Sequence, residues 1–288
     1  MKIAIGSGKG GTGKTLLSTN LFYAIHKQNQ KITLVDCDSE EPNDMLFFKG
    51  EMVKTKTVTQ KNPVIDSEKC VFCDKCNEWC NYNAIFYVKE KKVIRVLEDL
   101  CHGCGACSVA CEFGAITEKD VELGVVNTFK VPVDSTIIET RLKVGVYTPV
   151  PVLKAGISEK IDTDHVIFDS PPGTSCPFIQ TVERADYVIL ITEPTPFGLS
   201  DLRQSVETLK TMNKKYGVVV NRADLGDNAL YDYLKSENIP LLMEIPFSKK
   251  IAEVYSRGEL YAEHDEAFAQ QLYSLYIKIL KNHGISSN

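Results

Sequence analysis

Short apolar runs alternate with stretches of helical periodicity along most of this chain. The stretch after residue 15 places Leu17, Leu21, Ala24 and Ile25 on one face of a helix, and a last helix over about 266–281 has a similar stripe. The apolar runs are continuous, which is typical of strands buried on both faces of a parallel sheet. They occupy residues 2–5, 31–36, 164–169, 187–192, 217–220 and 240–245, and short strand-like runs with turns between them occupy 121–133, 136–139 and 142–146. The pattern predicts an α/β fold with a mostly parallel, doubly wound sheet.

Glycines crowd the loop between the first strand and the first helix. Residues 6–15 read GSGKGGTGKT, in which Gly8, Gly13, Lys14 and Thr15 have the P-loop spacing. Backbone N–H groups of such a loop surround phosphate oxygens, the lysine reaches the β- and γ-phosphates, and the hydroxyl is placed for Mg²⁺. A glycine-rich turn without a ligand is the alternative, but the strand, loop and helix together favour nucleotide. The predicted contacts with ATP are Gly8, Lys9, Gly10, Gly11, Thr12, Gly13, Lys14 and Thr15.

Acidic residues follow two of the apolar runs. Asp36 and Asp38 come at the end of the second strand, and Asp169 ends the strand over 164–169, four residues before Gly173. In open α/β sheets the carboxyl ends of the strands lie beside the phosphate-binding loop. The alternatives are a solvated acidic loop in the first case and a plain Pro-Gly turn in the second. With the phosphate loop present, we expect Thr15, Asp36 and Asp169 to hold Mg²⁺, the carboxylates through water.

Composition narrows the setting in which this chemistry takes place. The chain has 288 residues, of which 43% are apolar, and no run approaches the roughly 20 apolar residues of a membrane span. Its net charge of -5, with no long basic block, argues against a nucleic-acid partner. Ten cysteines without a secretory signal are expected to be reduced thiols in the cytoplasm, and therefore metal ligands.

Eight of these cysteines form two matching runs. Each run has the spacing C-x2-C-x2-C-x3-C, beginning at Cys70 and at Cys101. Thiolates at this spacing hold three irons of one [4Fe–4S] cluster, while the fourth cysteine ligates the other cluster. Structural zinc is the alternative, but four cysteines in one short run suit it poorly. The expected ligand sets are Cys70, Cys73, Cys76 and Cys111 for one cluster, and Cys101, Cys104, Cys107 and Cys80 for the second.

The two runs resemble a bacterial two-cluster ferredoxin. That family usually has proline after each fourth cysteine, whereas this chain has Asn81 and Glu112. The resemblance implies a small α+β ferredoxin domain of the 2[4Fe–4S] type over residues 61–119. It would be inserted into a P-loop ATPase domain formed by residues 1–60 and 120–288.

The lysine at position 9 narrows the class of P-loop. The sequence from Lys9 to Thr15, KGGTGKT, resembles the deviant Walker A loop of MinD, ParA and Mrp-type ATPases. The resemblance implies a homodimer closed by ATP, in which Lys9 reaches the partner's phosphates. It also implies catalytic roles, and the expected catalytic residues are Lys9, Lys14, Asp38, which would orient the attacking water, and Asp169. Further nucleotide contacts implied by the family are Gly173 to the γ-phosphate, Asn221 to the adenine edge and Arg222 stacked on the base.

Three functions are compatible with these features. The favoured one is an ATPase that gates electron transfer through two clusters to an acceptor protein. The second is a carrier or assembly ATPase for iron–sulfur clusters or metals, with Cys176 as a labile ligand across a dimer or, alternatively, as an inert residue. The third is a positioning ATPase of the MinD/ParA kind whose clusters sense redox state.

Overall fold

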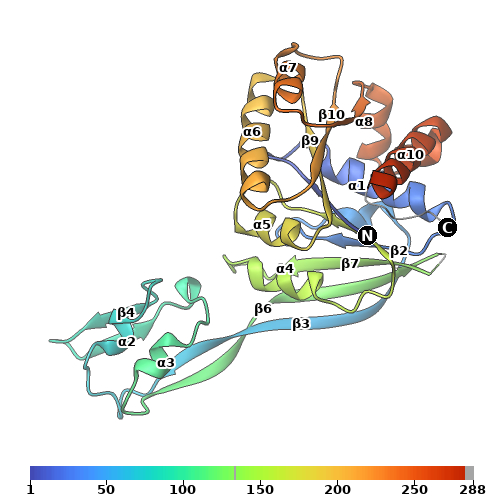
Figure 1. The fold of residues 1–288 in the computed structure, drawn as a ribbon. Helices are drawn as coiled ribbons and strands as arrows, with labels where there is room; N and C mark the ends of the chain where they lie inside the picture. The colour runs from blue at the N-terminus through green and yellow to red at the C-terminus, as the bar shows by residue number, and fades with distance from the viewer. Residues whose placement is uncertain (133, 283–288) are drawn as a thin grey trace. The chain divides into compact units, whose positions relative to one another are not determined.

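The computed structural model describes residues 1–132 and 134–282, and in it the apolar runs form the middle of one sheet (Figure 1). Among the described residues, this sheet has nine strands in the order β11-β10-β9-β1-β8-β2-β7-β6-β3. The pairings that join β11 through to β7 are parallel. The strands are β1 (Lys2–Gly6), β2 (Ile32–Asp36), β3 (Glu51–Ile65), β6 (Ile116–Val131), β7 (Ser135–Leu142), β8 (His165–Asp169), β9 (Tyr187–Thr192), β10 (Tyr216–Asn221) and β11 (Leu241–Ile245).

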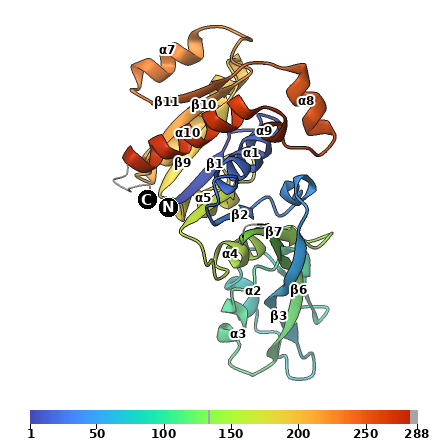
Figure 2. The same cartoon turned by 90° about the vertical axis from the view of Figure 1, so that its right-hand side faces the viewer.

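Helices cover both faces of the parallel part. Figures 1 and 2 show α1 and α10 together on one face and α5 and α6 on the other, which is the doubly wound arrangement that the sequence predicts. No helix in the described residues is long and apolar enough to cross a membrane. The helices are α1 (Lys14–His26), α2 (Lys75–Glu78), α3 (Ala106–Ala110), α4 (Val150–Ile157), α5 (Cys176–Glu183), α6 (Pro196–Thr211), α7 (Ala229–Ser236), α8 (Lys249–Ser256), α9 (Tyr261–His264) and α10 (Glu266–Asn282), with 3-10 turns η1 (Asp44–Phe47) and η2 (Glu98–Leu100).

The chain divides into two compact units. The larger one comprises residues 1–56, 126–141 and 153–288, and the smaller one comprises 57–125 and 142–152. The core of the larger unit lies between β1, β2, β8 and β9 and the helices α1 and α10, where Leu17, Phe22 and Leu272 are fully buried. Burial of this apolar surface fixes the carboxyl ends of the strands, and with them the site, in place.

The smaller unit has a very different construction. It contains the antiparallel pair β4 (Ile85–Val88) and β5 (Val93–Val96) with the short helices α2 and α3. Its buried cluster consists of Cys76, Ile85 and Cys107. The strands β3 and β6, which are neighbours in the sheet, run from the larger unit into this one. The sequence did not predict β3, and of β6 it predicted only the strand-like run that begins at residue 121.

Candidate nucleotide site and cysteine cavities

The glycine-rich loop joins the end of β1 to the start of α1. Gly11 and Gly13 have φ of 77° and 104°, a region that residues with a side chain rarely adopt. A Cβ atom on Gly13 would lie 2.7 Å from Nδ2 of Asn221. Glycine is therefore required at Gly13 both for its backbone conformation and for the close approach of β10. The loop then leads into α1, whose N-terminal N–H groups favour an anion.

Lys14 is held within the loop by a short chain of hydrogen bonds. Its Nζ donates to Ser7 Oγ at 3.1 Å, and Ser7 Oγ donates to the carbonyl of Lys9 at 2.6 Å. Burial lowers the pKa of Lys14, while the carboxylates of Asp169 and Asp38 act to raise it. The Lys14 ammonium group therefore lies at the loop that the sequence predicts to bind phosphate. The carboxylates of Asp169 and Asp38 are near enough to influence its pKa.

Thr15 and Asp169 meet at the end of β8. Thr15 Oγ1 donates to Asp169 Oδ2 at 2.9 Å. Asp169 is 3% exposed, and burial is the main reason that its pKa rises to about 6. Its second oxygen, Oδ1, is buried and has no hydrogen-bond partner in the described part of the chain. A hydroxyl beside a carboxylate with a free oxygen fits Mg²⁺, which takes few protein ligands and keeps several waters.

Asp36 organises the loop after β2. Its Oδ1 accepts from the N–H of Asp38 at 3.1 Å, and its Oδ2 accepts from Asn43 at 2.8 Å and Asp44 at 3.0 Å. Burial is again the largest influence, and it raises the pKa of Asp36 well above the ordinary value. Asp36 therefore shapes the loop that carries Asp38, and both its oxygens already accept hydrogen bonds.

A cavity of about 290 Å³ adjoins the glycine-rich loop. Asn221 and Arg222 line it together with the loop, as does Phe247 from the segment between β11 and α8. Asn221 Nδ2 donates to the carbonyl of Thr12 at 2.8 Å, and Asn221 Oδ1 accepts from the N–H of Arg222 at 3.0 Å. Asn221 thus ties the loop to β10, and its contact with adenine stays a prediction. The lining residues are Gly11, Gly13, Lys14, Thr15, Leu16, Asn221, Arg222, Pro246, Phe247, Ser248, Ile251, Ala252 and Tyr255.

Three further glycines that the sequence predicts to contact the nucleotide lie in or beside the loop. The N–H of Gly173, expected at the γ-phosphate, donates to the carbonyl of Ser7 at 3.0 Å, and its φ is 86°. A Cβ on Gly8 would meet the backbone carbonyl of Asp201 at 2.6 Å, whereas one on Gly10 would meet nothing within 4 Å. Gly8 is thus needed for packing, while Gly10 leaves the loop backbone open on one side.

The smaller unit contains two cavities lined by cysteines. Cys70, Cys73, Cys76 and Cys111 line the first, and Cys80, Cys101, Cys104 and Cys107 line the second. Each cavity thus takes three cysteines from one run and the last cysteine from the other run. All ten cysteines are free of disulfides.

The surroundings of these thiols are partly apolar. Burial raises the pKa of Cys76 to about 11, and it also raises the pKa of Cys101 and Cys107. Such thiols lose their protons when a metal supplies compensating charge. Within residues 1–132 and 134–282, no three His, Cys, Asp or Glu side chains are grouped so as to hold a metal ion. A cubane cluster is a different ligand, because it spreads four irons over the corners of a cage and its thiolates line that cage.

A family model matches most of the chain. Residues 3–261 match the CobQ/CobB/MinD/ParA nucleotide binding domain, CbiA. The chain belongs to this family. MinD of Pyrococcus horikoshii, solved with Mg-ADP, has the same fold, with a TM-score of 0.59 at 20% identity over 98% of this chain and 97% of that one. Both the deviant Walker A resemblance and the mostly parallel P-loop fold are thereby confirmed.

Proteins similar in sequence to this MinD/ParA-type chain have names that indicate different functions. An uncharacterised protein of Methanocaldococcus jannaschii is 30% identical over 92% of this chain and 93% of its own length. An iron-sulfur cluster carrier protein of Saccharolobus solfataricus is 24% identical over 97% of this chain and 83% of its own. A stretch covering 26% of this chain is 34% identical to 87% of the pyruvate synthase subunit PorD of M. jannaschii.

Two acidic residues of this family member belong to the site although the sequence did not single them out. Asp44 is fully buried, and neither carboxylate oxygen has a hydrogen-bond partner among the described residues. Burial and the neighbouring Asp36 and Asp169 raise the pKa of Asp44 well above its usual range. No signal marks Asp44, because it opens the turn η1 instead of ending a strand.

Glu193 is the second of these residues. Its Oε1 lies 2.8 Å from Nη1 of Arg222, and its Oε2 lies 3.9 Å from Nζ of Lys9. Lys9, expected to reach a partner's phosphates, therefore lies against a carboxylate of its own chain. The position of Glu193 directly after β9 is the signal that could have found it, since Asp36 and Asp169 also lie at strand ends.

Proposed function

We propose that this protein is an ATPase that couples nucleotide-driven closure of a homodimer to electron transfer through two [4Fe–4S] clusters, toward an acceptor protein. The observation that carries the proposal is the pair of cysteine cavities. Each is lined by four thiols in the crossed combination expected of two clusters in a ferredoxin, with residues 61–119 as the inserted domain. The likeness to pyruvate synthase subunit PorD over about a quarter of the chain supports a small transferable module.

The cysteines are the residues that would hold the clusters. Bound there, each cluster would accept and release one electron at a low potential. The chain's part is to supply four thiolates per cavity and an apolar wall, to which Ile65, Ile94 and Ile116 contribute in the first cavity. Apolar walls limit water around a cluster and so tune its potential.

Hydrolysis of ATP would use the residues gathered at the strand ends. Thr15 and Asp169 would hold Mg²⁺, which neutralises charge on the phosphates. Lys14 would exchange its bond with Ser7 for phosphate oxygens, and Asp38 would orient the attacking water in line with the leaving group. In the dimer, Lys9 would leave Glu193 for the partner's nucleotide, which exchanges one anion for another of higher charge.

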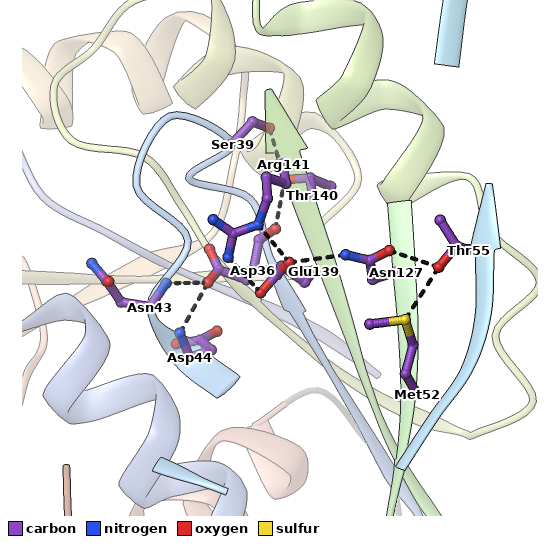
Figure 3. A network of polar contacts seen from close by, with 10 residues as sticks. All are labelled: Asp36, Ser39, Asn43, Asp44, Met52, Thr55, Asn127, Glu139, Thr140 and Arg141. Atoms are coloured by element: carbon purple, nitrogen blue, oxygen red, sulfur yellow. Dashed lines mark hydrogen bonds and ion pairs between the residues drawn. The ribbon is translucent and has the colours of Figure 1, made fainter. Parts of the chain in front are cut away.

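Coupling between the two chemistries needs a physical link, and the larger unit provides one (Figure 3). Thr140 Oγ1 donates to the carbonyl of Asp36 at 2.7 Å, and Ser39 Oγ donates to Thr140 Oγ1 at 2.7 Å. The next residue toward the N-terminus of β7, Glu139, accepts from Asn127 Nδ2 at 3.1 Å. The loop after β2 is thereby tied through β7 to β6.

The link then continues to β3. Thr55 Oγ1 donates to Asn127 Oδ1 at 3.0 Å. Arg141 clamps Glu139 through two bonds of 3.0 Å, which fixes the carboxylate that Asn127 uses (Figure 3). Because β3 and β6 are the strands that continue into the smaller unit, a rearrangement of the loop at Asp36 would be felt at the base of both.

The test is a redox titration followed by EPR on anaerobically purified protein, in three states: nucleotide-free, with Mg-ADP, and with a non-hydrolysable ATP analogue. We expect eight irons per chain, and a shift of at least one cluster potential between the ADP and ATP-analogue states. Thr55→Val should reduce that shift while leaving ATP turnover nearly unchanged. A brown protein whose potentials and hydrolysis rate are independent of each other would contradict the coupling, and a colourless one would contradict the clusters.

A carrier of iron–sulfur clusters is the second candidate, and it is favoured by the relatives that bear this name. The two functions differ in what leaves the protein. A carrier loses iron to an apo-acceptor and to chelators, whereas an electron donor keeps its iron through many turnovers. Iron content measured before and after incubation with an apo-ferredoxin, with and without ATP, distinguishes them.

A further inference from the structure

The hairpin of β4 and β5 has two faces of opposite character. Its strands pair antiparallel, with Phe86 opposite Arg95 and Ile85 opposite Val96. Ile85 is buried against Cys76 and Cys107, and Ile94 packs on the same cluster. Phe86 points away from this cluster, because side chains alternate along a strand, and it is 48% exposed. The hairpin thus covers cluster ligands with one face and presents the other to solvent.

The turn of the hairpin and the outward-facing Arg95 carry unpaired positive charge. The turn between the strands reads Lys89-Glu90-Lys91-Lys92, and all three lysines and Arg95 are exposed. None of these four takes part in an ion pair within the described residues. The other five basic side chains of the smaller unit are all paired with carboxylates: Lys61, Lys69, Lys75, Lys119 and Lys143. The free positive charge of this unit is therefore gathered in one place, on a chain of net charge -5.

We propose that the outer face of the β4–β5 hairpin docks an acidic electron-carrier protein. The proposal rests on the function proposed above, because it needs clusters that exchange electrons. Charge complementarity selects the partner: on a chain of net charge -5, a carrier with an acidic patch is attracted to the hairpin, which orients the encounter. Phe86, opposite Arg95, supplies the apolar centre that such an interface needs within its charged rim.

A protein is favoured over a nucleic acid by the rest of the surface. A phosphate backbone needs a stripe of positive charge along its length, while this patch is one hairpin on an acidic chain. The position also suits electron exchange. A partner on the outer face would be separated from Cys76 and Cys107 by one β layer, on the order of 10 Å thick. One electron would pass from the reduced cluster to the oxidised carrier, so that the cluster is oxidised and the carrier reduced by one electron each.

The turn offers a variant that separates charge from folding. Lys92 has φ of 48°, and its N–H donates to the carbonyl of Lys89 at 3.0 Å. Asparagine and glycine adopt this left-handed conformation more easily than lysine does. Lys92→Gly therefore removes a positive charge while easing the backbone, so a loss of docking in this variant cannot be attributed to a weakened hairpin.

The experiment uses the intact, cluster-loaded chain with oxidised flavodoxin, an acidic one-electron carrier, and with cytochrome c, a basic one. The docking variant is Lys89→Gln/Lys91→Gln/Lys92→Gln, and the matched control is Lys61→Gln/Lys69→Gln/Lys119→Gln, which removes the same charge from the same unit. Stopped-flow absorbance measures the second-order rate of flavodoxin reduction by dithionite-reduced protein. Anisotropy of labelled oxidised flavodoxin measures binding without electron transfer.

The docking variant should slow flavodoxin reduction about tenfold at low ionic strength and weaken binding, with the difference vanishing at high salt. Lys92→Gly should show part of this loss with unchanged iron content, and the control should show none. Cytochrome c should react as fast with the docking variant as with the unchanged protein. Equal flavodoxin rates and affinities for both triple variants overturn the docking site while the clusters still reduce cytochrome c. Failure to reduce either carrier points to the proposed function instead. The choice of partner is overturned if no form of the protein binds flavodoxin, while the unchanged protein binds duplex DNA or anionic vesicles and the docking variant does not.

Discussion

The nucleotide site and the cysteine cavities are built on opposite principles. Around the nucleotide site, buried strands and the glycine-rich loop bring Thr15, Asp169 and Lys14 together: Thr15 bonds to Asp169, and the charge of Asp169 acts on the Lys14 ammonium. The buried hydrophobic cluster of the smaller unit has three side chains, of which two are cysteines. A large apolar core can hold a polar site ready, whereas a small module depends on its metal for stability. Ligand loss should therefore affect the two regions very differently.

The largest effect is expected from breaking one crossed ligand set. Cys111→Ser should remove the cluster of the first cavity, halve the iron and expose the smaller unit to proteolysis, while the larger unit keeps its thermal transition. Cys73→Ser should damage the same cluster, so the double variant should lose no more iron than either single one.

Iron analysis and limited proteolysis check this, with Cys176→Ser as the control. Cys176 is exposed at the start of α5 and lines neither cavity. If Cys111→Ser and Cys104→Ser deplete one and the same cluster, the ligand sets are not crossed.

The complementary change is made in the larger unit. Lys14→Ala removes the ammonium from the phosphate loop, so ATP turnover should fall at least about 10²-fold. The visible absorbance of the clusters should be unchanged, because the smaller unit does not depend on this residue. A coupled phosphate-release assay and an absorbance spectrum provide the two readouts. Normal turnover would mean that the loop does not bind the γ-phosphate.

Asp44→Asn examines the buried carboxylate that has no partner. We expect Asp44 to accept hydrogen bonds from the water shell of Mg²⁺, so the variant should bind Mg-ADP roughly tenfold more weakly. Binding of ADP without Mg²⁺ should change little, because the raised pKa of Asp44 favours its neutral form when the metal is absent. Calorimetry with and without Mg²⁺ measures both. A fall in affinity that is equal in the two conditions would indicate general damage to the site.

We expect Asp169 to make nucleotide binding depend on pH. Its pKa of about 6 in the fold lies above the ordinary 3.8, so the stability it contributes is full below about pH 4 and is lost as the pH rises through 6. The loss is on the order of 3 kcal/mol in the metal-free protein. Mg²⁺ favours the ionised carboxylate and should restore this stability. Thermal unfolding at pH 5 and pH 8, with and without Mg-ADP, should show a larger gain from the ligand at pH 8, and equal gains would contradict the role of Asp169.

The smallest effect concerns Glu193, which pairs with Lys9 and Arg222. Glu193→Gln frees both side chains, and partly exposed ion pairs contribute only about 0–1 kcal/mol. We expect a few-fold easier dimerisation with an ATP analogue, measured by sedimentation, because Lys9 no longer has to leave an anion. Glu259→Gln, which breaks an exposed pair with Arg257, serves as the control. Weaker dimerisation of Glu193→Gln would show that Glu193 helps the closed state.

The sequence predicted the parallel core well because its strands are continuous apolar runs. It missed β3, whose long polar and exposed stretch resembles a loop, and it predicted only the run from residue 121 of the longer strand β6. It also missed Asp44, whose burial depends on a turn that no local pattern marks, and the bond from Asn221 to Thr12, which joins residues 209 positions apart. Spacing predicted which cysteines share a cavity, because the crossed arrangement follows from how one short run can wrap a cluster. The roles of the predicted site residues and the bounds 1–60, 61–119 and 120–288 stay predictions.

The segment between β3 and β6 begins and ends at neighbouring points of the chain. The N–H of Asp66, just past β3, donates to the carbonyl of Ala115, just before β6, at 2.8 Å. The two ends of the segment 66–115 therefore lie side by side, at adjacent strands of the sheet. Such a segment can be gained, dropped or exchanged with little disturbance to its host. A protein engineer could therefore replace residues 66–115 with a short turn and keep the nucleotide-binding fold.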